Sequence, residues 1–302
     1  MASTESKIIE DMYDQLSSVL AANPDLPLGV TRAVMDSAMV SMPTEPEGVS
    51  YSAVSAGGVK ALWCIPAECA DGRVIMYTHG GGYIGGSTVS HRRLTGHLAR
   101  AAGVRVLSLD YALAPERPHP AASDDALAAF RWLREQGFSA DHIAVSGDSA
   151  GGGLCTAVVL RLREAGEDVP AAVMPLSPWY DLELVGESLV RSRGAGGVVS
   201  ADGLVNMVKA FLQGASAKDP IANPLYADLA GFPPVLIHVG AREALVSDSE
   251  TFARNAEAAG VEVTLVVEPD MLHVYPFGAG RMPEADEAIA RMASWVRPKL
   301  GL

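Results

Sequence analysis

Short apolar runs alternate with longer segments of helical periodicity from residue 74 to near the end of the chain. The apolar runs are residues 74–77, 104–110, 143–147, 171–177, 234–240 and 261–268. Helical patterns occupy most of the gaps, at 91–103, 123–137, 150–166, 250–260 and 284–300. Strands and helices in this order are typical of repeated βαβ units. The pattern therefore predicts an α/β fold, with a mostly parallel central sheet flanked by helices.

Two regions interrupt this alternation. Residues 1–45 are predicted to form one or two amphipathic helices, and residues 181–225 mix Gly, Pro and apolar residues between two predicted strands. Connections of this length are usually functional loops or lids. We therefore expect one domain over residues 1–302, with a helical cap supplied by 1–45 and 181–225. A further apolar run at 49–66 predicts a β-hairpin, because two glycines stand at its centre.

Composition limits the partners and the compartment. A chain of 302 residues with a net charge of −13 is long enough for one large core, and its acidity disfavours nucleic acids and anionic membranes as partners. Its three cysteines form no CxxC pair and no zinc-binding spacing, so we expect reduced thiols, no metal and a cytoplasmic protein. The first residues lack the pattern of a secretory signal, and no apolar run is long enough for a membrane span.

A serine stands at the centre of a glycine-rich turn, GDSAGG at residues 147–152. The turn follows a predicted strand and precedes a predicted helix, which is the context that a GxSxG nucleophile requires. Glycines on both sides leave space for a sharp, strained turn, and the helix N-terminus favours a developing anion. Ser149 is therefore the candidate nucleophile, and a simple helix-capping serine is the alternative.

A second glycine-rich segment, THGGGYIGGS at residues 78–87, follows the first predicted parallel strand. Three consecutive glycines allow backbone N–H groups to approach a substrate oxygen, as an oxyanion hole requires. A phosphate-binding loop is the alternative, but the chain has no GxGxxG that opens a helix and no GK(S/T) motif.

These motifs give the chain a family resemblance. It resembles the hormone-sensitive-lipase-like branch of the α/β-hydrolases, the bacterial family IV (GDXG) carboxylesterases, over about residues 74–298. The resemblance is carried by HGGGY at 79–83, the segment 111–133, GDSAGG at 147–152, PLSPWYDL at 175–182, the segment 223–240 and MLHVYPF at 271–277. It implies a serine esterase that needs no cofactor and acts on a small-molecule ester.

The family pattern also assigns the groups around the nucleophile. It implies that the oxyanion donors are the backbone N–H groups of Gly81, Gly82 and Ala150. Side chains in the two motifs would support the loop and the turn without reacting, namely His79, Tyr83 and Asp148.

A serine nucleophile needs a histidine base, and seven histidines compete for the role. In α/β-hydrolases the chain order is serine, acid, histidine, and only His238 and His273 follow Ser149. His238 falls inside a predicted strand, where a side chain packs or bonds locally. His273 follows the last strand in a loop, so it is the predicted base, and activity should rise with pH as it loses its proton. Structural roles are expected for the others, His79, His91, His97, His119 and His142.

The acid that holds the histidine must come from a short list of carboxylates. In VGAREALVSDSE, residues 239–250, the segment from Ser247 to Glu250 fits a capping box, and Asp248 falls in the first turn of the same predicted helix. Only Glu243 lies in the loop between strand and helix. Glu243 is therefore the predicted acid, with Asp181, after an earlier strand, as the alternative.

A glutamate at this position departs from the family, in which most members carry aspartate. The extra methylene moves the carboxylate outward by ~1.5 Å, the length of one C–C bond. We therefore expect the backbone of residues 241–244 to be set back.

The substrate is constrained only loosely. By resemblance, short- or medium-chain acyl esters are expected, cleaved through an acyl-enzyme, and a homodimer is possible. Apolar residues of the predicted cap could face the site or only pack the cap onto the core, namely Val205, Met207, Val208, Phe211 and Leu212. The alternatives are a lactonase or amidase with the same residues, or a small-molecule receptor of the same fold, although receptors of this branch have lost the catalytic histidine.

Overall fold

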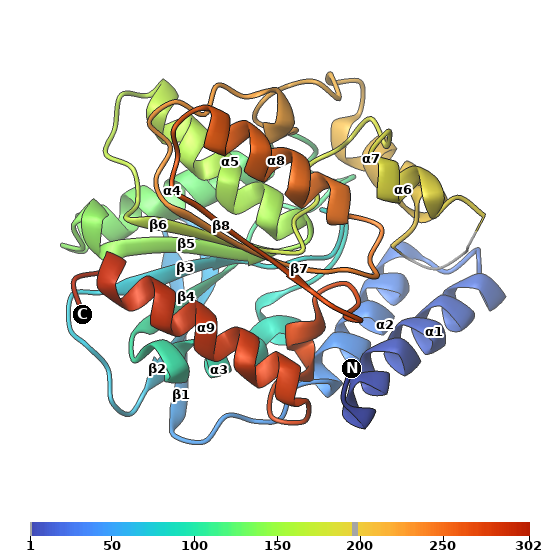
Figure 1. Ribbon diagram of the computed structural model, residues 1–302, viewed down its shortest axis with the longest axis horizontal. Helices are drawn as coiled ribbons and strands as arrows, with labels where there is room; N and C mark the ends of the chain where they lie inside the picture. Colours follow the sequence, from blue (N-terminus) through green and yellow to red (C-terminus); the bar gives the residue numbers. More distant parts are fainter. Residues whose placement is uncertain (1, 195–198) are drawn as a thin grey trace.

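The computed structural model describes residues 2–194 and 199–302, and within these ranges the strands form one eight-stranded sheet (Figure 1). Its strand order is β1-β2-β4-β3-β5-β6-β7-β8, antiparallel from β1 to β4 and parallel from β4 onward. The strands are β1 (Val49–Ala56), β2 (Val59–Pro66), β3 (Val74–Thr78), β4 (Arg105–Asp110), β5 (Ile143–Asp148), β6 (Ala172–Leu176), β7 (Val235–Gly240) and β8 (Val263–Glu268). The six predicted parallel-sheet strands and the hairpin are confirmed.

Helices cover both faces of the sheet. In Figure 1, α4, α5 and α8 lie on one face, while α3 and α9 lie on the other. Each face has its own apolar core. The α-helices are α1 (Lys7–Ala22), α2 (Leu28–Ser41), α3 (Thr88–Ala102), α4 (Ala121–Glu135), α5 (Ala150–Glu164), α6 (Glu187–Arg191), α7 (Ala201–Leu212), α8 (Val246–Ala258) and α9 (Pro283–Lys299). Short 3₁₀ helices are η1 (Thr4–Ser6), η2 (Ala140–His142), η3 (Pro224–Tyr226) and η4 (Tyr275–Gly278).

The central strands explain the continuous apolar runs in the sequence. β3, β5, β6 and β7 are buried along their whole length, because a parallel strand between two helical layers has no face toward water. Their carboxyl ends meet at one edge of the sheet, which is where open α/β sheets bind ligands. The segments that leave these ends contain Ser149 after β5, Glu243 after β7 and the glycine-rich loop after β3.

The two regions that interrupt the alternation gather on one side of the molecule. The first of these regions contains α1 and α2, as predicted, and the second contains α6 and α7; these four helices lie together on the right of Figure 1. Residue 1 and residues 195–198, which belong to these predicted cap regions, lie outside the described residues. None of the helices in the described ranges combines the length and the apolar character that crossing a membrane requires.

Candidate active site

Ser149 occupies a strained turn between β5 and α5. Its φ of 53° and ψ of −122° lie in a region that residues with a side chain rarely adopt, and its N–H donates to the carbonyl of Leu176 at 2.9 Å. A Cβ atom at Gly147 or Gly151 would overlap the backbone carbonyl of Thr78, so these positions require glycine. The strand, the tight turn and the helix that the GxSxG motif needs are therefore all present.

The glycine-rich loop after β3 lies beside this turn. Gly81 and Gly82 have φ of 120° and 63°, and both line the same cavity as Ser149, a small space of about 40 Å³. Gly80, which precedes them, donates its N–H to Asp148 at 2.9 Å. The loop is thus fixed to the residue next to the serine, and Ala150, which follows the serine, is the first residue of α5.

A buried polar network holds the Asp148 carboxylate. It accepts hydrogen bonds from the hydroxyl of Tyr77 at 2.8 Å and from Gly80, and His91 Nε2 lies within 3.3 Å. Burial acts to raise the pKa of Asp148, but His91 and the Tyr77 hydroxyl outweigh it and the pKa is lowered. An ionised carboxylate therefore supports the loop. The sequence carried no signal for Tyr77, and His91, expected to be only structural, contacts this network.

His79 lies inside the loop rather than in the cavity lining. Its Nδ1 is 2.8 Å from the carbonyl of Gly80, and its ring stacks on Tyr111 with 4.3 Å between ring centroids. Burial, and secondarily His91, lowers the pKa of His79 to about 4, so the ring is neutral at physiological pH. A neutral Nδ1–H can then donate to the carbonyl of Gly80.

Helix α7 contacts the loop through Tyr83. The ring of Tyr83 stacks on Phe211 with 3.8 Å between centroids. Met207 and Leu204 line the cavity at Ser149. Of these two, only Met207 was a candidate from the sequence. The remaining apolar candidates of α7 behave differently: Val208 packs against the core, Leu212 is buried in it and Val205 is exposed.

His273 and Glu243 form a buried pair at the edge of the same cavity. Nδ1 of His273 is 3.1 Å from Oε1 of Glu243, and each residue is only 6% exposed. The other carboxylate oxygen of Glu243 accepts hydrogen bonds from the hydroxyl of Ser177 at 2.6 Å and from the N–H of Gly240 at 3.0 Å. Since His273 and Ser149 line one cavity, the structure brings the serine, the histidine and the glutamate together.

Ser177 connects three segments of this site. Besides donating to Glu243, its hydroxyl accepts the N–H of Val274 at 3.0 Å, and its own N–H donates to the carbonyl of His238 at 2.7 Å. The glutamate and the loop that follows His273 are therefore held by one side chain at the end of β6. Sequence reasoning missed Ser177, although its position directly after a buried strand was a usable signal.

Comparison with known proteins identifies the family. A family model described as "alpha/beta hydrolase fold" matches residues 75–277. The chain is 40% identical to an acetyl-hydrolase of Streptomyces hygroscopicus, over 82% of this chain and 83% of that protein. It is similar to a solved esterase of the bacterial hormone-sensitive lipase family, with a TM-score of 0.92, 39% identity and full coverage of both chains. The chain belongs to the hormone-sensitive-lipase-like carboxylesterases.

The family membership settles the class of reaction. An ethyl acetate hydrolase of Pseudomonas putida is a further relative, 35% identical over 76% of this chain and 74% of that protein. The esterase is a carboxylic ester hydrolase of the α/β-hydrolase fold, and its substrate is a small-molecule ester. The prediction that the chain is an enzyme is therefore confirmed, and the receptor alternative is not supported.

The predicted capping box of the esterase is wrong. Helix α8 begins at Val246 with Leu245 as its N-cap, and no side chain caps it. The Ser247 hydroxyl is 2.7 Å from that of Ser188 in α6, and Glu250 is exposed. A contact between two helices therefore replaces the local cap.

The two other candidate acids are committed to backbone groups. Asp248 lies in the first turn of α8, as predicted, but one of its oxygens accepts the N–H groups of Tyr180 and Asp181, both at 2.8 Å. Asp181 in turn accepts hydrogen bonds from backbone N–H groups of its own loop, those of Glu183, Val185 and Gly186. Both carboxylates therefore stabilise the start of the segment that carries α6, and Glu243 is the one paired with His273.

Asp248→Asn is expected to remove a pH-dependent loss of stability. Burial raises the pKa of Asp248 from 3.8 to about 7, so in this interval the folded protein keeps a proton that the unfolded chain releases. The free energy of unfolding therefore falls as the pH rises through the interval, by at most about 1.4 kcal/mol per pH unit. Asparagine cannot ionise, yet its amide oxygen can still accept both N–H groups.

Urea unfolding of the wild type and of Asp248→Asn at mildly acidic and mildly alkaline pH measures this difference. The variant should gain stability relative to the wild type as the pH rises. Asp248→Ala, which loses the acceptor, should be destabilised at every pH. Parallel pH profiles for the wild type and Asp248→Asn would contradict the raised pKa.

Two further histidines, His238 and His119, make contacts away from the catalytic cavity. His238 is buried in β7, its Nδ1 lies 3.3 Å from the Tyr275 hydroxyl, and burial lowers its pKa to about 4. His119 contacts Asp219 at 2.9 Å. His238 is therefore a neutral core side chain, as its position in a strand predicted.

Proposed function

We propose that the esterase hydrolyses short- to medium-chain acyl esters through an acyl-enzyme, with Ser149 as nucleophile, His273 as base and Glu243 as acid. The observation that carries this proposal is the 3.1 Å contact between His273 and Glu243 at the edge of the cavity that Ser149 lines. Glu243 accepts the Nδ1–H, which leaves Nε2 of His273 as the basic atom. The imidazolium that forms when the serine proton moves is then stabilised by a buried carboxylate.

The oxyanion of the tetrahedral intermediate would be bound by backbone N–H groups of Gly81, Gly82 and Ala150. Their positions in the loop after β3 and at the start of α5 support this role, because such donors are fixed before the reaction and need no reorganisation. In this proposal, Asp148 acts only through the loop, by holding Gly80. His79 and Tyr83 brace the same loop from its two sides.

The catalytic cycle follows from these roles. Ser149 attacks the ester carbonyl while His273 takes its proton, and collapse of the intermediate passes that proton to the leaving alcohol. Water then attacks the acyl-enzyme with His273 again as base, which releases the acid and restores the serine. Because this chain has glutamate where most of the family has aspartate, we predict that the backbone of residues 241–244 is set back. Superposition on a relative that carries aspartate checks this prediction.

Small acyl groups fit the space beside the serine. The cavity of about 40 Å³ holds on the order of a few water molecules, so it accepts an acetyl or similar group without rearrangement. Met207 limits it, because its sulfur lies against Gly82. Relatives named acetyl-hydrolase and ethyl acetate hydrolase support a preference for short acyl groups.

An acyl-length series of chromogenic esters tests this preference. We expect kcat/KM to be highest for acetyl to hexanoyl esters and to fall for longer chains, since the longer chains require side chains such as Met207 to move. A serine-reactive phosphonate should abolish turnover at one molecule bound per chain. Turnover that survives complete labelling would contradict a serine nucleophile, and a preference for amides or lactones over simple esters would change the substrate class.

The cellular location and the oligomeric state belong to the same proposal. The free thiols of Cys64, Cys69 and Cys155 support a reducing, cytoplasmic location. A homodimer is suggested by the family resemblance alone, and light scattering at several protein concentrations tests it.

A further inference from the structure

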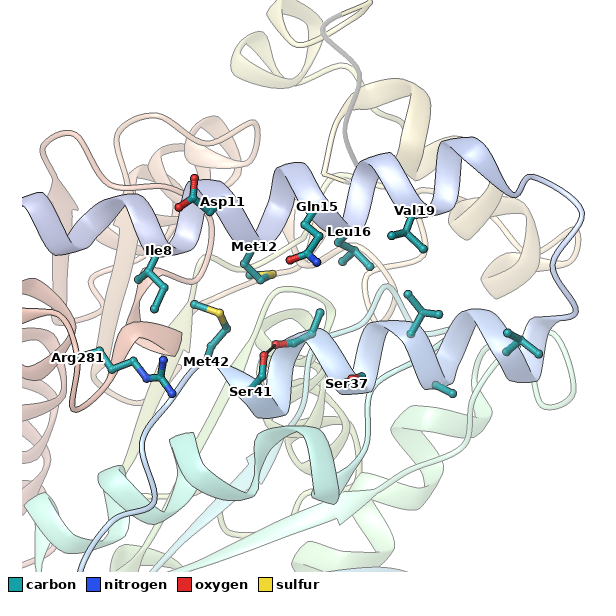
Figure 2. A pocket seen from close by; sticks show the side chains of 14 residues that line it. Ile8, Asp11, Met12, Gln15, Leu16, Val19, Ser37, Ser41, Met42 and Arg281 are labelled. Carbon is teal, nitrogen blue, oxygen red and sulfur yellow. Dashed lines mark hydrogen bonds between the residues drawn. The ribbon is translucent and has the colours of Figure 1, made fainter.

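A second and much larger cavity lies between α1 and α2, outside the space at Ser149. It has a volume of about 790 Å³ and is shown in Figure 2, where side chains of both helices point into the gap between them. We call it the α1–α2 groove. Its apolar lining includes Ile8, Met12 and Leu16 from α1, Val34 and Ala38 from α2, and Met42, which directly follows α2.

The groove is unusual for two helices joined by a short connection. Amphipathic helices in this arrangement normally close their apolar faces on each other, at about 8–10 Å between axes. Here the apolar sides remain separated, and Val19 and Val30 are exposed at 37% and 45%. An open apolar space of this volume has the size and the lining of a small-molecule site.

The groove adjoins the catalytic cavity. Leu16 lines both spaces, and Tyr13, Met35 and Met39 of the same two helices line the cavity at Ser149. Leu16, which is buried, is therefore the side chain at which the two spaces adjoin. If Leu16 moved aside, an acyl chain too long for the cavity would enter the groove, and its methylenes would leave water for an apolar surface.

A different pocket lies on the leaving-group side. It has a volume of about 190 Å³, includes His273 and Tyr13, and is otherwise lined largely by polar residues such as Glu10, Asp14 and Arg242. Because His273 must give its proton to the leaving alcohol, the alcohol half of the ester lies beside His273. The groove shares no lining residue with this pocket and meets the catalytic cavity at Leu16, so it is the space left for the acyl half.

We infer that the α1–α2 groove binds the distal part of a linear acyl chain that passes Leu16, which extends the substrate class to esters of medium- and long-chain fatty acids. This inference rests on the proposed function, since it needs an acyl group attached at Ser149. Short acyl groups stay in the cavity and do not use the groove. The groove then determines how steeply activity falls with acyl length.

Ser37→Trp tests the inference, because Ser37 is exposed on α2 and lines the groove but not the catalytic cavity. Each methylene kept out of the groove should cost a factor of about four, so loss of two or more should lower kcat/KM for a decanoyl ester at least about tenfold. For a butyryl ester, the change should stay within about twofold. Ser18→Trp is the matched control: Ser18 is exposed on α1 and lines neither the groove nor the two pockets beside it.

The possible outcomes separate the inference from the proposed function. Equal effects of Ser37→Trp and Ser18→Trp on the decanoyl ester would overturn the groove assignment, as would an effect that follows alcohol length in a series of acetate esters. A wild-type dimer that Ser37→Trp dissociates would assign the groove to a second copy instead. A wild type that fails to hydrolyse even the butyryl ester would refute the proposed function itself.

Folding of the variant is checked separately. Thermal unfolding should show similar midpoints for Ser37→Trp and Ser18→Trp, because both place tryptophan at an exposed helical position. If Ser37→Trp does not fold, Ala33→Trp, one turn earlier in the same groove and also exposed, should show the same selective loss on the decanoyl ester. An Ala33→Trp variant that keeps wild-type activity on both esters would overturn the inference.

Discussion

Ser149→Ala is expected to lower kcat by about 10⁴- to 10⁶-fold, the range seen when a serine nucleophile is removed. The reason is that no other group of the site can form the acyl-enzyme, while the oxyanion donors and the bound geometry still give a small residual rate. The strained backbone of Ser149 is retained by alanine, so the free energy of unfolding should change little. Steady-state kinetics with a short chromogenic ester measure the effect.

Ser146→Ala is the matched control for this variant. Ser146 lies three residues earlier on β5, is fully buried, and donates its hydroxyl to the carbonyl of Met174 at 2.7 Å. Its loss should cost about 1 kcal/mol of stability and leave kcat near the wild-type value. Wild-type turnover in Ser149→Ala, or an equal loss in both variants, would refute Ser149 as nucleophile.

Glu243→Gln is expected to lower kcat by about 10³- to 10⁴-fold, because the neutral amide no longer stabilises the His273 imidazolium and can hold the wrong tautomer. Glutamine keeps the length of the side chain, so the packing around Ser177 and Gly240 changes little. Stopped assays over a wide range of enzyme concentration are needed to measure the residual rate. Glu243→Asp should retain more activity, since it keeps the charge but shortens the reach by ~1.5 Å.

Asp181→Asn is the control that separates the two candidate acids. Its side-chain oxygens bind backbone N–H groups of the loop that leads to α6, so the expected loss is in stability, about 1–3 kcal/mol, with kcat near wild type. If Asp181→Asn lost activity as strongly as expected for Glu243→Gln, while Glu243→Gln remained active, the acid assignment would be reversed.

The local pattern of apolar residues and glycines predicted most of the fold. The apolar runs that became β3 and β5 are buried on both faces, so burial alone made them visible in the sequence, and the hairpin turn shows the positive φ angles that its two glycines permit. The predicted capping box failed for the opposite reason. The hydroxyl of Ser247 meets Ser188, a residue 59 positions away, and a contact between separate helices has no local signature.

The residues of the candidate site also fall into those that local pattern predicted and those that depend on tertiary contacts. Chain order and motif context led to Ser149, Glu243 and His273, because each lies in a loop directly after a predicted strand. Tyr77, His91 and Ser177 were missed as partners of this site, because their contacts depend on which strands are neighbours and, for His91, on where α3 packs. Tyr77 reaches Asp148 since β3 pairs with β5, and Ser177 reaches Glu243 since β6 pairs with β7.

The sequence by itself determined the class of fold, the nucleophile turn and the glycine-rich loop, because these depend on burial periodicity and on steric demands within a few residues. Only the tertiary structure decided what the acidic residues 243–250 do. In the structure, Glu243 contacts a histidine, Asp248 accepts two backbone N–H groups, and Glu250 is exposed to solvent. The α1–α2 groove likewise exists only in three dimensions, since its volume is set by the distance between two helices and leaves no mark in the periodicity of either.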